Sequence, residues 1–391
     1  MRIRRKPPYN TKGQIAESNR GTVYSLRLIV DEVVTVIVFA TGISGCGKLE
    51  YLRDAAKISG HMDIFDVGEK MFEKSRQLGI EIPEWKILDM DIFALSYLRA
   101  VTFEELLKSR SEYQGASSRD LVVSTHTCFR WKKHLVPAFN FYYLNSLQPD
   151  LYINILDNAH YIKARLEKGK WRGRLTLKDI LVWRDEETFV TQMLAEYQRK
   201  PFYIISRNEP PSLLVDIIER VEKPKLRGER PSTIKVYLSY PITHVVGNPE
   251  FFENKEVIKT TLRKAGVIVF DPITVEEADL IEKAREAERN GSDYVEFEFE
   301  GETFRIPVEE IADAEDDILD QIVARDYKLI DQSDAIVVYY PVETVSPGVL
   351  NEINYGFTHN KDVYAIFPHK VSPFLKYYTT RIFRHVDELI E

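Results

Sequence analysis

The fold of the N-terminal half is indicated by one stretch of sequence, Val34-Thr-Val-Ile-Val-Phe-Ala-Thr-Gly-Ile-Ser-Gly-Cys-Gly-Lys48. Its first seven residues are mostly apolar and rich in β-branched side chains, which is typical of a buried strand in a parallel sheet. A glycine-rich turn follows, and residues 49–57 then have a helical pattern. Such a turn between a strand and a helix lets backbone N–H groups surround phosphate oxygens, and its lysine adds a positive charge. We therefore predict a nucleotide phosphate-binding loop formed by Gly42, Ser44, Gly45, Gly47 and Lys48.

The residue after the lysine departs from this motif. Phosphate loops place Ser or Thr there as a ligand for Mg²⁺, whereas this chain has Leu49 followed by Glu50. Glu50 is either a substitute ligand or an ordinary glutamate on a helix surface, and the second interpretation is the simpler one. The loop predicts ATP with Mg²⁺ as the cofactor of this half, and Leu49 argues against ATP turnover.

Strands and helices continue to alternate beyond the loop. A helix is predicted at 70–78, and buried strands at 61–66, 120–126, 151–157 and 202–206. Strands that alternate with helices form a doubly wound parallel sheet, which binds ligands at the carboxyl ends of its strands. We therefore predict an α/β domain of this kind. A basic stretch between Lys163 and Arg184 lies in its later part.

The N-terminal half resembles the adenylate-kinase-like branch of the phosphate-loop kinases over residues 34–220. The resemblance rests on the loop GISGCGK, on the strand DLVVSTHTCFRW with His126, and on the basic stretch. It implies that Arg165, Arg172 and Arg174 belong to a lid over the phosphates. The residues alone also allow a second interpretation, in which these arginines cover a solvated helix face and His126 is a hydrogen-bonded residue at a strand end.

Composition and charge limit the classes of function. The 391 residues are 44% hydrophobic and 29% charged, which is globular composition of a length that predicts two domains. The 53 basic and 61 acidic residues give a net charge of −8, which argues against a nucleic-acid polymer as a partner. Two cysteines exclude a disulfide framework and a cysteine-based zinc site, and we predict no metal-ligating residues. The first apolar run, residues 28–40, is too short to span a membrane, so we expect a cytoplasmic protein without a membrane partner.

A change in composition suggests where the two domains meet. Residues 222–232 are charged, contain two prolines and a glycine, and lack apolar periodicity, which is typical of a linker. We predict an N-terminal extension at 1–30, a phosphate-loop kinase-like domain at 31–221, the linker at 222–232 and a second domain at 233–391. The extension is expected to be poorly ordered or loosely docked, with a short strand as the alternative.

The second domain is also predicted to be a doubly wound parallel sheet. Strands are predicted at 234–239, 267–271, 335–340 and 362–367, the last of which closes the sheet, and a charged helix at 273–290. Residues 295–306 alternate apolar and charged side chains around Glu300-Gly301, which predicts an inserted β-hairpin that caps a pocket or mediates assembly. A long acidic helix is predicted from Val308 to Ile330. The turn Ser346-Pro-Gly348 after a strand offers a capping hydroxyl and free N–H groups to a phosphate or a sugar hydroxyl.

This half resembles the nucleoside 2-deoxyribosyltransferase superfamily, which implies a flavodoxin-like sheet. The resemblance rests on Ser346-x-Gly348-Val349-x-x-Glu352, on Asp326 and on Tyr237 in the first strand. It implies that Glu352 attacks the anomeric carbon and that Asp326 orients it or protonates the leaving base. The transferases hold an aspartate where this chain has Ser346, and the 2′-deoxynucleoside 5′-monophosphate N-glycosidases hold serine there. Because a hydroxyl can donate to a 5′-phosphate that a carboxylate would repel, Ser346 favours a nucleotide substrate.

Further expectations follow from the same resemblance. Tyr237 and Gly348 are assigned to substrate binding. Tyr240 stands where the family has glycine, and it is expected to narrow the pocket or stack on a base. The resemblance also implies a homo-oligomer, and glycosidic hydrolysis that needs no cofactor.

We therefore predict a two-domain enzyme that hydrolyses the N-glycosidic bond of a (deoxy)nucleoside 5′-monophosphate and carries a nucleotide-binding kinase-like half. An oxocarbenium-like transition state is stabilised by a carboxylate, which fits the residue types. Three alternatives stay open: a base-exchange transferase, a nucleotide-sensing regulator without catalysis, and an active nucleotide kinase.

Overall fold

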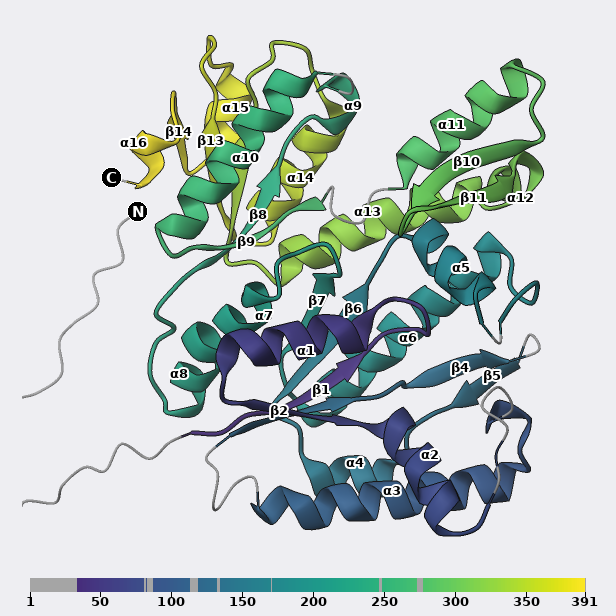
Figure 1. Cartoon of the computed structure of the whole chain (residues 1–391). Helices are drawn as coiled ribbons and strands as arrows, with labels where there is room; N and C mark the ends of the chain where they lie inside the picture. The colour runs from purple at the N-terminus through teal and green to yellow at the C-terminus, as the bar shows by residue number, and fades with distance from the viewer. Residues whose placement is uncertain are drawn as a thin grey trace, which may run out of the picture. The chain divides into compact units, whose positions relative to one another are not determined.

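A computed structural model describes residues 34–80, 82, 87–112, 119–131, 134–169, 171–245, 248–272 and 277–390 (Figure 1). The predicted N-terminal extension lies outside these residues. Residues 34–391 form one compact unit that contains two parallel sheets of five strands each. The prediction of an α/β protein with two parallel sheets is therefore confirmed. None of the described helices is both long and apolar enough to cross a membrane.

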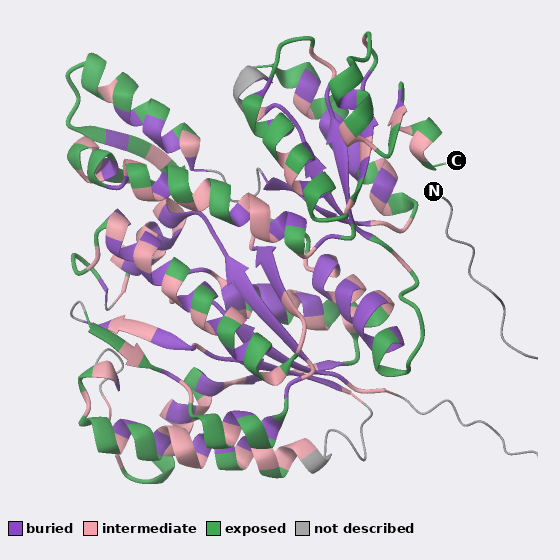
Figure 2. Cartoon of the chain, turned by 180° about the vertical axis from the view of Figure 1, so that it is seen from behind, coloured by how far each residue is buried: buried purple, intermediate pink, exposed green. Residues whose placement is uncertain are grey.

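The first sheet has the strand order β2-β3-β1-β6-β7. Its strands are β1 (Ile37–Thr41), β2 (Met62–Asp66), β3 (Asp120–Ser124), β6 (Leu151–Leu156) and β7 (Phe202–Ser206). Ile37 of β1 pairs with Leu121 on one side, and Val38 pairs with Leu151 on the other. All residues of β1, β3 and β6 are buried (Figure 2), as expected for the central strands of a sheet with helices on both faces. The carboxyl end of β1 therefore lies at the centre of the sheet edge where ligands bind.

The helices of this half follow the strands in alternation. They are α1 (Lys48–Ser59), α2 (Val67–Gln77), the 3₁₀ turn η1 (Ile87–Asp89), α3 (Ile92–Glu112), α4 (Phe141–Leu147), α5 (Ala159–Glu167), α6 (Leu177–Gln198) and α7 (Ser212–Ile217). A short antiparallel hairpin, β4 (Cys128–Trp131) with β5 (His134–Pro137), follows β3. The basic stretch thus divides between α5, a turn and α6.

The second sheet has the order β14-β13-β12-β8-β9. Its strands are β8 (Lys235–Ser239), β9 (Ile268–Phe270), β12 (Ala335–Tyr339), β13 (Asp362–Ile366) and β14 (Arg381–Phe383). Its helices are α9 (Ile242–Val245), α10 (Pro249–Lys264), α11 (Ala278–Arg289), α12 (Val308–Asp313), α13 (Glu315–Asp331), α14 (Pro347–Thr358), α15 (Pro373–Tyr378) and α16 (Asp387–Ile390). The predicted hairpin is present as β10 (Tyr294–Phe299) and β11 (Glu302–Pro307), with the turn at Glu300-Gly301.

Two predicted elements differ from the structure. The acidic helix expected from Val308 to Ile330 is divided at Ala314, whose N–H donates to the carbonyl of Ile311 at 3.1 Å in a tight turn. Ile311, Ala314 and Ile318 are all buried, so the apolar spacing continues across the break and the sequence pattern does not reveal it. The sheet is also one strand wider than predicted, because β14 pairs with β13 beyond the strand expected to close it.

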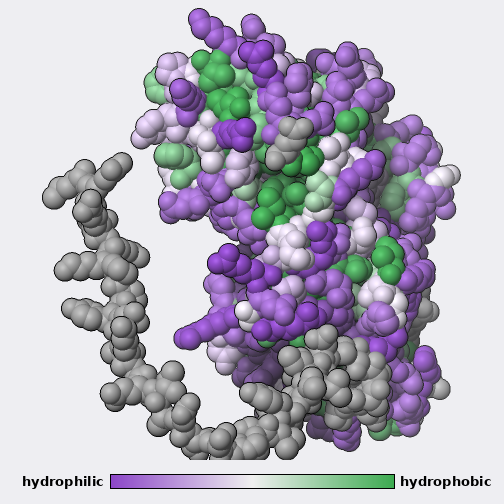
Figure 3. Space-filling model, turned by 90° about the vertical axis from the view of Figure 1, so that its left-hand side faces the viewer, coloured by the Kyte–Doolittle hydropathy of each residue, from purple (hydrophilic) through white to green (hydrophobic). Residues whose placement is uncertain are grey.

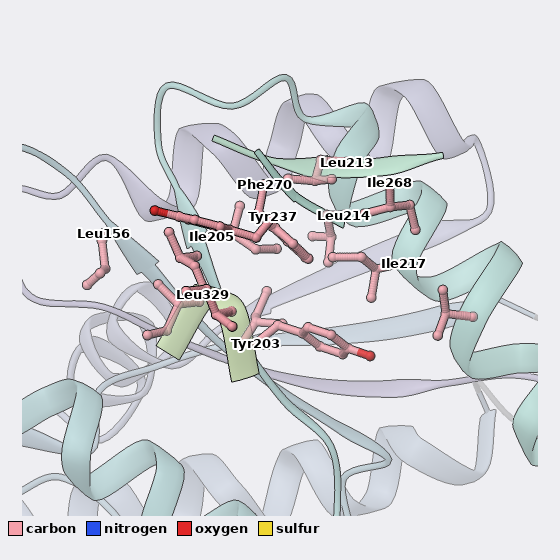
Figure 4. Packing of buried hydrophobic residues seen from close by; sticks show 14 of the residues in the cluster. Leu156, Tyr203, Ile205, Leu213, Leu214, Ile217, Tyr237, Ile268, Phe270 and Leu329 are labelled. Carbon is pink, nitrogen blue, oxygen red and sulfur yellow. The ribbon is translucent and has the colours of Figure 1, made fainter. Parts of the chain in front are cut away.

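The predicted linker begins in helical structure. A π-helical turn, η3 (Ile218–Glu222), runs into α8 (Lys223–Leu226), and Lys223 forms an ion pair of 2.9 Å with Asp120 of β3. One cluster of buried hydrophobic side chains draws on both halves. In it, Leu213, Leu214 and Ile217 of α7 lie with Ile268 and Phe270 of β9 and with Leu329 (Figure 4). The surface in Figure 3 is mostly hydrophilic, with hydrophobic residues in small groups.

Candidate functional site

The predicted phosphate loop lies between β1 and α1. Gly42, Gly45 and Gly47 have positive φ angles of 147°, 83° and 73°, which side chains of L residues rarely allow. A Cβ atom on Gly42 would lie 2.6 Å from the carbonyl oxygen of Ile155 in β6. The backbone of the loop therefore requires glycine at this position, with or without a ligand.

Glu187 of α6 joins the loop to the next strand end. It is fully buried and accepts hydrogen bonds from the N–H groups of Thr127 at 2.9 Å, Cys128 at 2.8 Å and Gly42 at 3.4 Å. Burial favours protonation, but the His126 ring at 3.7 Å, Lys48 and the Thr127 N–H outweigh it and lower the pKa of Glu187 to about 2. Glu187 lies in a run of charged residues, and nothing in that pattern marks it as buried.

Lys48 is buried at the start of α1 and lines a cavity. Its ammonium group contacts the carbonyl oxygen of Thr125 and lies 3.5 Å from that of Gly42. Burial lowers the pKa of Lys48. A buried ammonium group at a loop of N–H donors favours an anionic ligand, because a phosphate replaces the hydration that burial removes.

The phosphate loop opens into a cavity of about 410 Å³. Its wall on the side of β2, α2 and α3 is largely apolar, with Val67, Met71, Phe72 and Leu95 among its residues. Charged and polar side chains lie among them and at the strand ends: Lys48, Asp66, Arg99, Ser124, His126 and Arg165. The cavity thus joins a phosphate-binding end to a carboxylate, Asp66, and to a second guanidinium, Arg99.

The three predicted lid arginines differ in position. Arg165 lines the cavity and donates to the carbonyl of Gly45 at 2.7 Å and to Asp157 at 2.6 Å. Arg172 and Arg174 are exposed on the turn between α5 and α6, and the guanidinium of Arg174 lies 5.0 Å from the centre of the Trp131 ring. Only Arg165 of these three is in direct contact with the loop.

The residues fit nucleotide phosphates better than they fit a magnesium ion at the usual position. Leu49 offers no ligand oxygen. Glu50 is largely exposed and pairs with Arg207 at 2.7 Å, which supports the interpretation of an ordinary surface glutamate. Within the described ranges, no group of three or more His, Cys, Asp or Glu residues is arranged to hold a metal ion. At the strand ends, the cavity lining contains the oxygen-bearing side chains of Asp66, Ser124 and Thr125.

In the C-terminal half, Glu352 of α14 lies beside the carboxyl end of β8. Its carboxylate accepts hydrogen bonds from the hydroxyl groups of Tyr237 at 2.9 Å and Ser239 at 2.5 Å. Burial raises the pKa of Glu352 to about 7, although both hydrogen bonds oppose the rise. A carboxyl group with this pKa can hold or release a proton near neutral pH. Ser239 was not among the predicted site residues.

Asp326 of α13 lies close enough to Tyr237 for its charge to act on the Tyr237 hydroxyl. Burial raises the pKa of Tyr237 well above its usual value, and the charges of Asp326 and Glu352 add to the rise. The fold thus brings together the two predicted catalytic carboxylates, which are 26 residues apart in the sequence, around one tyrosine.

The predicted phosphate turn caps α14. The Ser346 hydroxyl accepts from the N–H of Val349 at 3.5 Å, and the Ser346 N–H donates to Tyr340 at 2.7 Å. A Cβ atom added to Gly348 would meet nothing within 4 Å, so the helix start has open space on that side. Tyr240 is buried instead, and its hydroxyl donates to Asp271 at 2.7 Å.

Comparisons with known proteins show three solved structures that resemble the N-terminal half. A scan of family models and a search of curated proteins gave no match. Among solved structures, a shikimate kinase from Acinetobacter baumannii in complex with shikimate matches 50% of this chain and 98% of its own, at 14% identity and a TM-score of 0.34. A sugar kinase from Janibacter sp. HTCC2649 matches 49% and 98% at 16% identity and a TM-score of 0.28. An uncharacterized protein from Eubacterium ventriosum ATCC 27560 matches 49% and 99% at 10% identity and a TM-score of 0.26.

Proposed function

We propose that the N-terminal half binds a nucleoside triphosphate and transfers its terminal phosphoryl group to a small anionic acceptor that carries a hydroxyl group. One observation carries this proposal: a single cavity contains the phosphate loop with Lys48 at one end and Asp66 with Arg99 elsewhere in its lining. Phosphoryl transfer needs charges that hold the phosphates and a group that orients the attacking hydroxyl.

The residues divide between these tasks by their chemistry. Lys48 and Arg165 supply positive charge beside the loop, where the β- and γ-phosphates bind. Asp66 accepts hydrogen bonds from the Ser124 hydroxyl at 2.7 Å on one carboxylate oxygen and from the Glu69 N–H at 2.8 Å on the other. Each oxygen has a further lone pair, which can accept from an acceptor hydroxyl in the cavity. Arg99 suits a carboxylate or a phosphate on the acceptor, because its guanidinium can bind such groups through two hydrogen bonds. The apolar wall suits a ring.

Magnesium would arrive with the nucleotide and neutralise charge on its phosphates. Because position 49 is leucine, its protein ligands would come from the strand ends, where Ser124 and Thr125 carry hydroxyl oxygen atoms. A nucleotide-sensing role without turnover is the alternative that Leu49 favours.

A labelled-transfer assay tests the proposal. The full chain is incubated with Mg²⁺, ATP labelled in the γ-phosphate, and a panel of hydroxylated carboxylates and nucleoside monophosphates. We expect label in an acceptor, and Arg99→Met should raise the acceptor KM at least tenfold without changing the KM for ATP. Arg53→Met is the control, because Arg53 lies on α1 and pairs with Glu69 at the surface. ATP binding without transfer to any acceptor would favour the sensing role.

A second function is favoured by the arrangement around Glu352. We infer that the C-terminal half hydrolyses the N-glycosidic bond of a (deoxy)nucleoside 5′-monophosphate. Glu352 would attack or stabilise the anomeric carbon, and Asp326 would assist departure of the base. Ser346 with the N–H groups at the start of α14 would bind the 5′-phosphate. A carboxyl with a pKa near 7, held by two hydroxyl groups beside a second carboxylate, supports this role.

Release of free base from a panel of nucleoside monophosphates tests the second function. We expect Glu352→Gln to abolish release, while Glu343→Gln, at a largely exposed glutamate, leaves it unchanged. Addition of a different free base separates hydrolysis from base exchange, since only a transferase forms a new nucleotide. Absence of base release from every member of the panel would contradict the proposed hydrolase activity.

A further inference from the structure

The β10–β11 hairpin has one aromatic face and one charged face. Phe297 and Phe299 alternate with glutamates along β10, and Phe297 pairs with Phe304 of β11. Because successive strand residues point to opposite faces, the three rings share one side of the hairpin. This side packs on α5: Phe299 stacks on Tyr161 with 5.2 Å between ring centres, and Phe297 meets the His160 ring edge-on at 5.1 Å.

The tip of the hairpin reaches the arginine that contacts the phosphate loop. The guanidinium of Arg165 lies 4.8 Å from the centre of the Phe299 ring, and its Nε lies 3.9 Å from a carboxylate oxygen of Glu300. The same guanidinium donates to Gly45 of the loop at 2.7 Å and to Asp157 at 2.6 Å. Arg165 is therefore held between the hairpin and the loop.

We propose that Phe299 is a positioning residue for Arg165, so that a hairpin from the C-terminal half completes the phosphate site of the N-terminal half. This rests on the proposed binding of a nucleoside triphosphate, whose polyphosphate Arg165 would contact. A free arginine side chain has many rotamers, and fixing one of them when the ligand binds weakens binding. The aromatic face attracts the cation and fixes its position before the phosphate arrives.

A double-mutant cycle on the full chain tests this proposal. The affinity for MgATP is measured by calorimetry for the wild type, Phe299→Ala, Arg165→Ala and the double variant. We expect Phe299→Ala to weaken binding about three- to tenfold. In the Arg165→Ala background the same change should have no further effect. A merely structural contribution of the ring would weaken binding in both backgrounds.

Three further variants sharpen the test. Phe304→Ala is the matched control, because Phe304 lies on the same face with the same intermediate burial. The Lys168 ammonium lies near both rings, 5.3 Å from the centre of Phe304 and 5.8 Å from that of Phe299, whereas the Arg165 guanidinium lies over Phe299. It should change the affinity less than twofold. Phe299→Trp keeps an aromatic face and should restore wild-type affinity. Phe299→Leu keeps apolar bulk without the ring and should weaken binding like Phe299→Ala, and it provides the test if that variant does not fold.

Two results would overturn the proposal: wild-type affinity in both Phe299→Ala and Phe299→Leu, or an equal loss with and without Arg165. The variant Lys48→Ala separates this failure from failure of the proposed function. If Lys48→Ala no longer binds MgATP and the Phe299 variants bind it with wild-type affinity, nucleotide binding at the loop is supported and the positioning role of Phe299 is wrong. If Lys48→Ala binds MgATP like the wild type, binding at the phosphate loop itself is wrong and the positioning role falls with it.

Discussion

Asp66, the last residue of β2, accepts a hydrogen bond of 2.7 Å from Ser124, the last residue of β3. Both residues line the cavity below the phosphate loop, although they are 58 positions apart in the sequence. Parallel strands that end at one edge bring the two side chains together. Both carboxylate oxygens of Asp66 are held, because Oδ2 accepts from the Ser124 hydroxyl and Oδ1 accepts from the Glu69 N–H.

Replacement of Asp66 tests the assignment of this carboxylate. We expect Asp66→Asn to reduce phosphoryl transfer at least a hundredfold and to change the affinity for ATP less than threefold, because the group acts on the acceptor and not on the adenosine or the loop. The comparison is Asp63→Asn on the same strand, where Asp63 pairs with Arg119 at 2.9 Å away from the cavity lining. Equal transfer rates for the two variants would show that Asp66 has no special role.

The second prediction concerns the need for glycine at position 42 in the phosphate loop. Gly42→Ala forces a Cβ atom against the backbone oxygen of Ile155, which cannot move aside as a side chain can. We expect it to lower the free energy of unfolding by about 2–4 kcal/mol. Gly60→Ala, at a positive φ of 68° with no neighbour within 4 Å, should cost only about 1 kcal/mol. Urea denaturation of both variants measures the difference, and equal losses would contradict the close packing.

Glu187 should make stability fall in acid. Its pKa of about 2 in the folded chain lies below the ordinary 4.5. The ionised carboxylate therefore makes its full contribution to the free energy of unfolding above pH 4.5, and this contribution is lost as the pH falls toward 2. The contribution is about 3 kcal/mol. We therefore expect the stability difference between wild type and Glu187→Gln to be largest near pH 6 and to shrink steadily on acidification. A difference that stays constant from pH 6 to pH 3 would contradict the ionised state of Glu187.

Glu352 should have the opposite effect. Its pKa is about 7 in the folded chain and 4.5 ordinarily, so the folded state loses stability as the pH rises from 4.5 to 7. At pH 8 the full loss is about 3 kcal/mol. Glu352→Gln removes the charge and should unfold at higher urea concentration than the wild type at pH 8, with little difference at pH 4.5. Glu343→Gln should show no such pH dependence, and a Glu352→Gln variant that is not stabilised at pH 8 would refute the raised pKa.

The sequence predicts those parts of the site that depend on local pattern. The strand, the loop and the helix at residues 34–59 follow from β-branched residues, glycines and helical spacing that are adjacent in the chain. Family resemblance assigns Glu352 and Tyr237 to one site, but it does not predict the hydrogen bond between them. The contact of Ser239 with Glu352 is not predicted, because a serine at a strand end is compatible with many roles.

Other site residues depend on tertiary packing that the chain does not display locally. Asp66 and Arg99 enter the cavity only because β2 lies at the sheet edge beside β3 and α3 covers that end. Glu187 lies in a charged run that is typical of a helix surface. It is buried because α6 packs against the phosphate loop and the end of β3. The role of Tyr240 at the pocket stays a prediction. Its hydroxyl donates to Asp271, whose carboxylate lies within 2.8 Å of the ammonium groups of Lys255 and Lys259. The hairpin was predicted, but its position on α5 was not.

The central claim is that the phosphate loop binds a nucleoside triphosphate through Lys48, and calorimetric titration of the full chain with MgATP tests it most directly. We expect saturable binding by the wild type, at least a tenfold loss in Lys48→Ala, and unchanged affinity in Lys57→Ala. Lys57 lies on the same helix but is exposed and pairs with Asp54. No heat of binding with the wild type at millimolar MgATP, or equal affinities of the two lysine variants, would contradict the account.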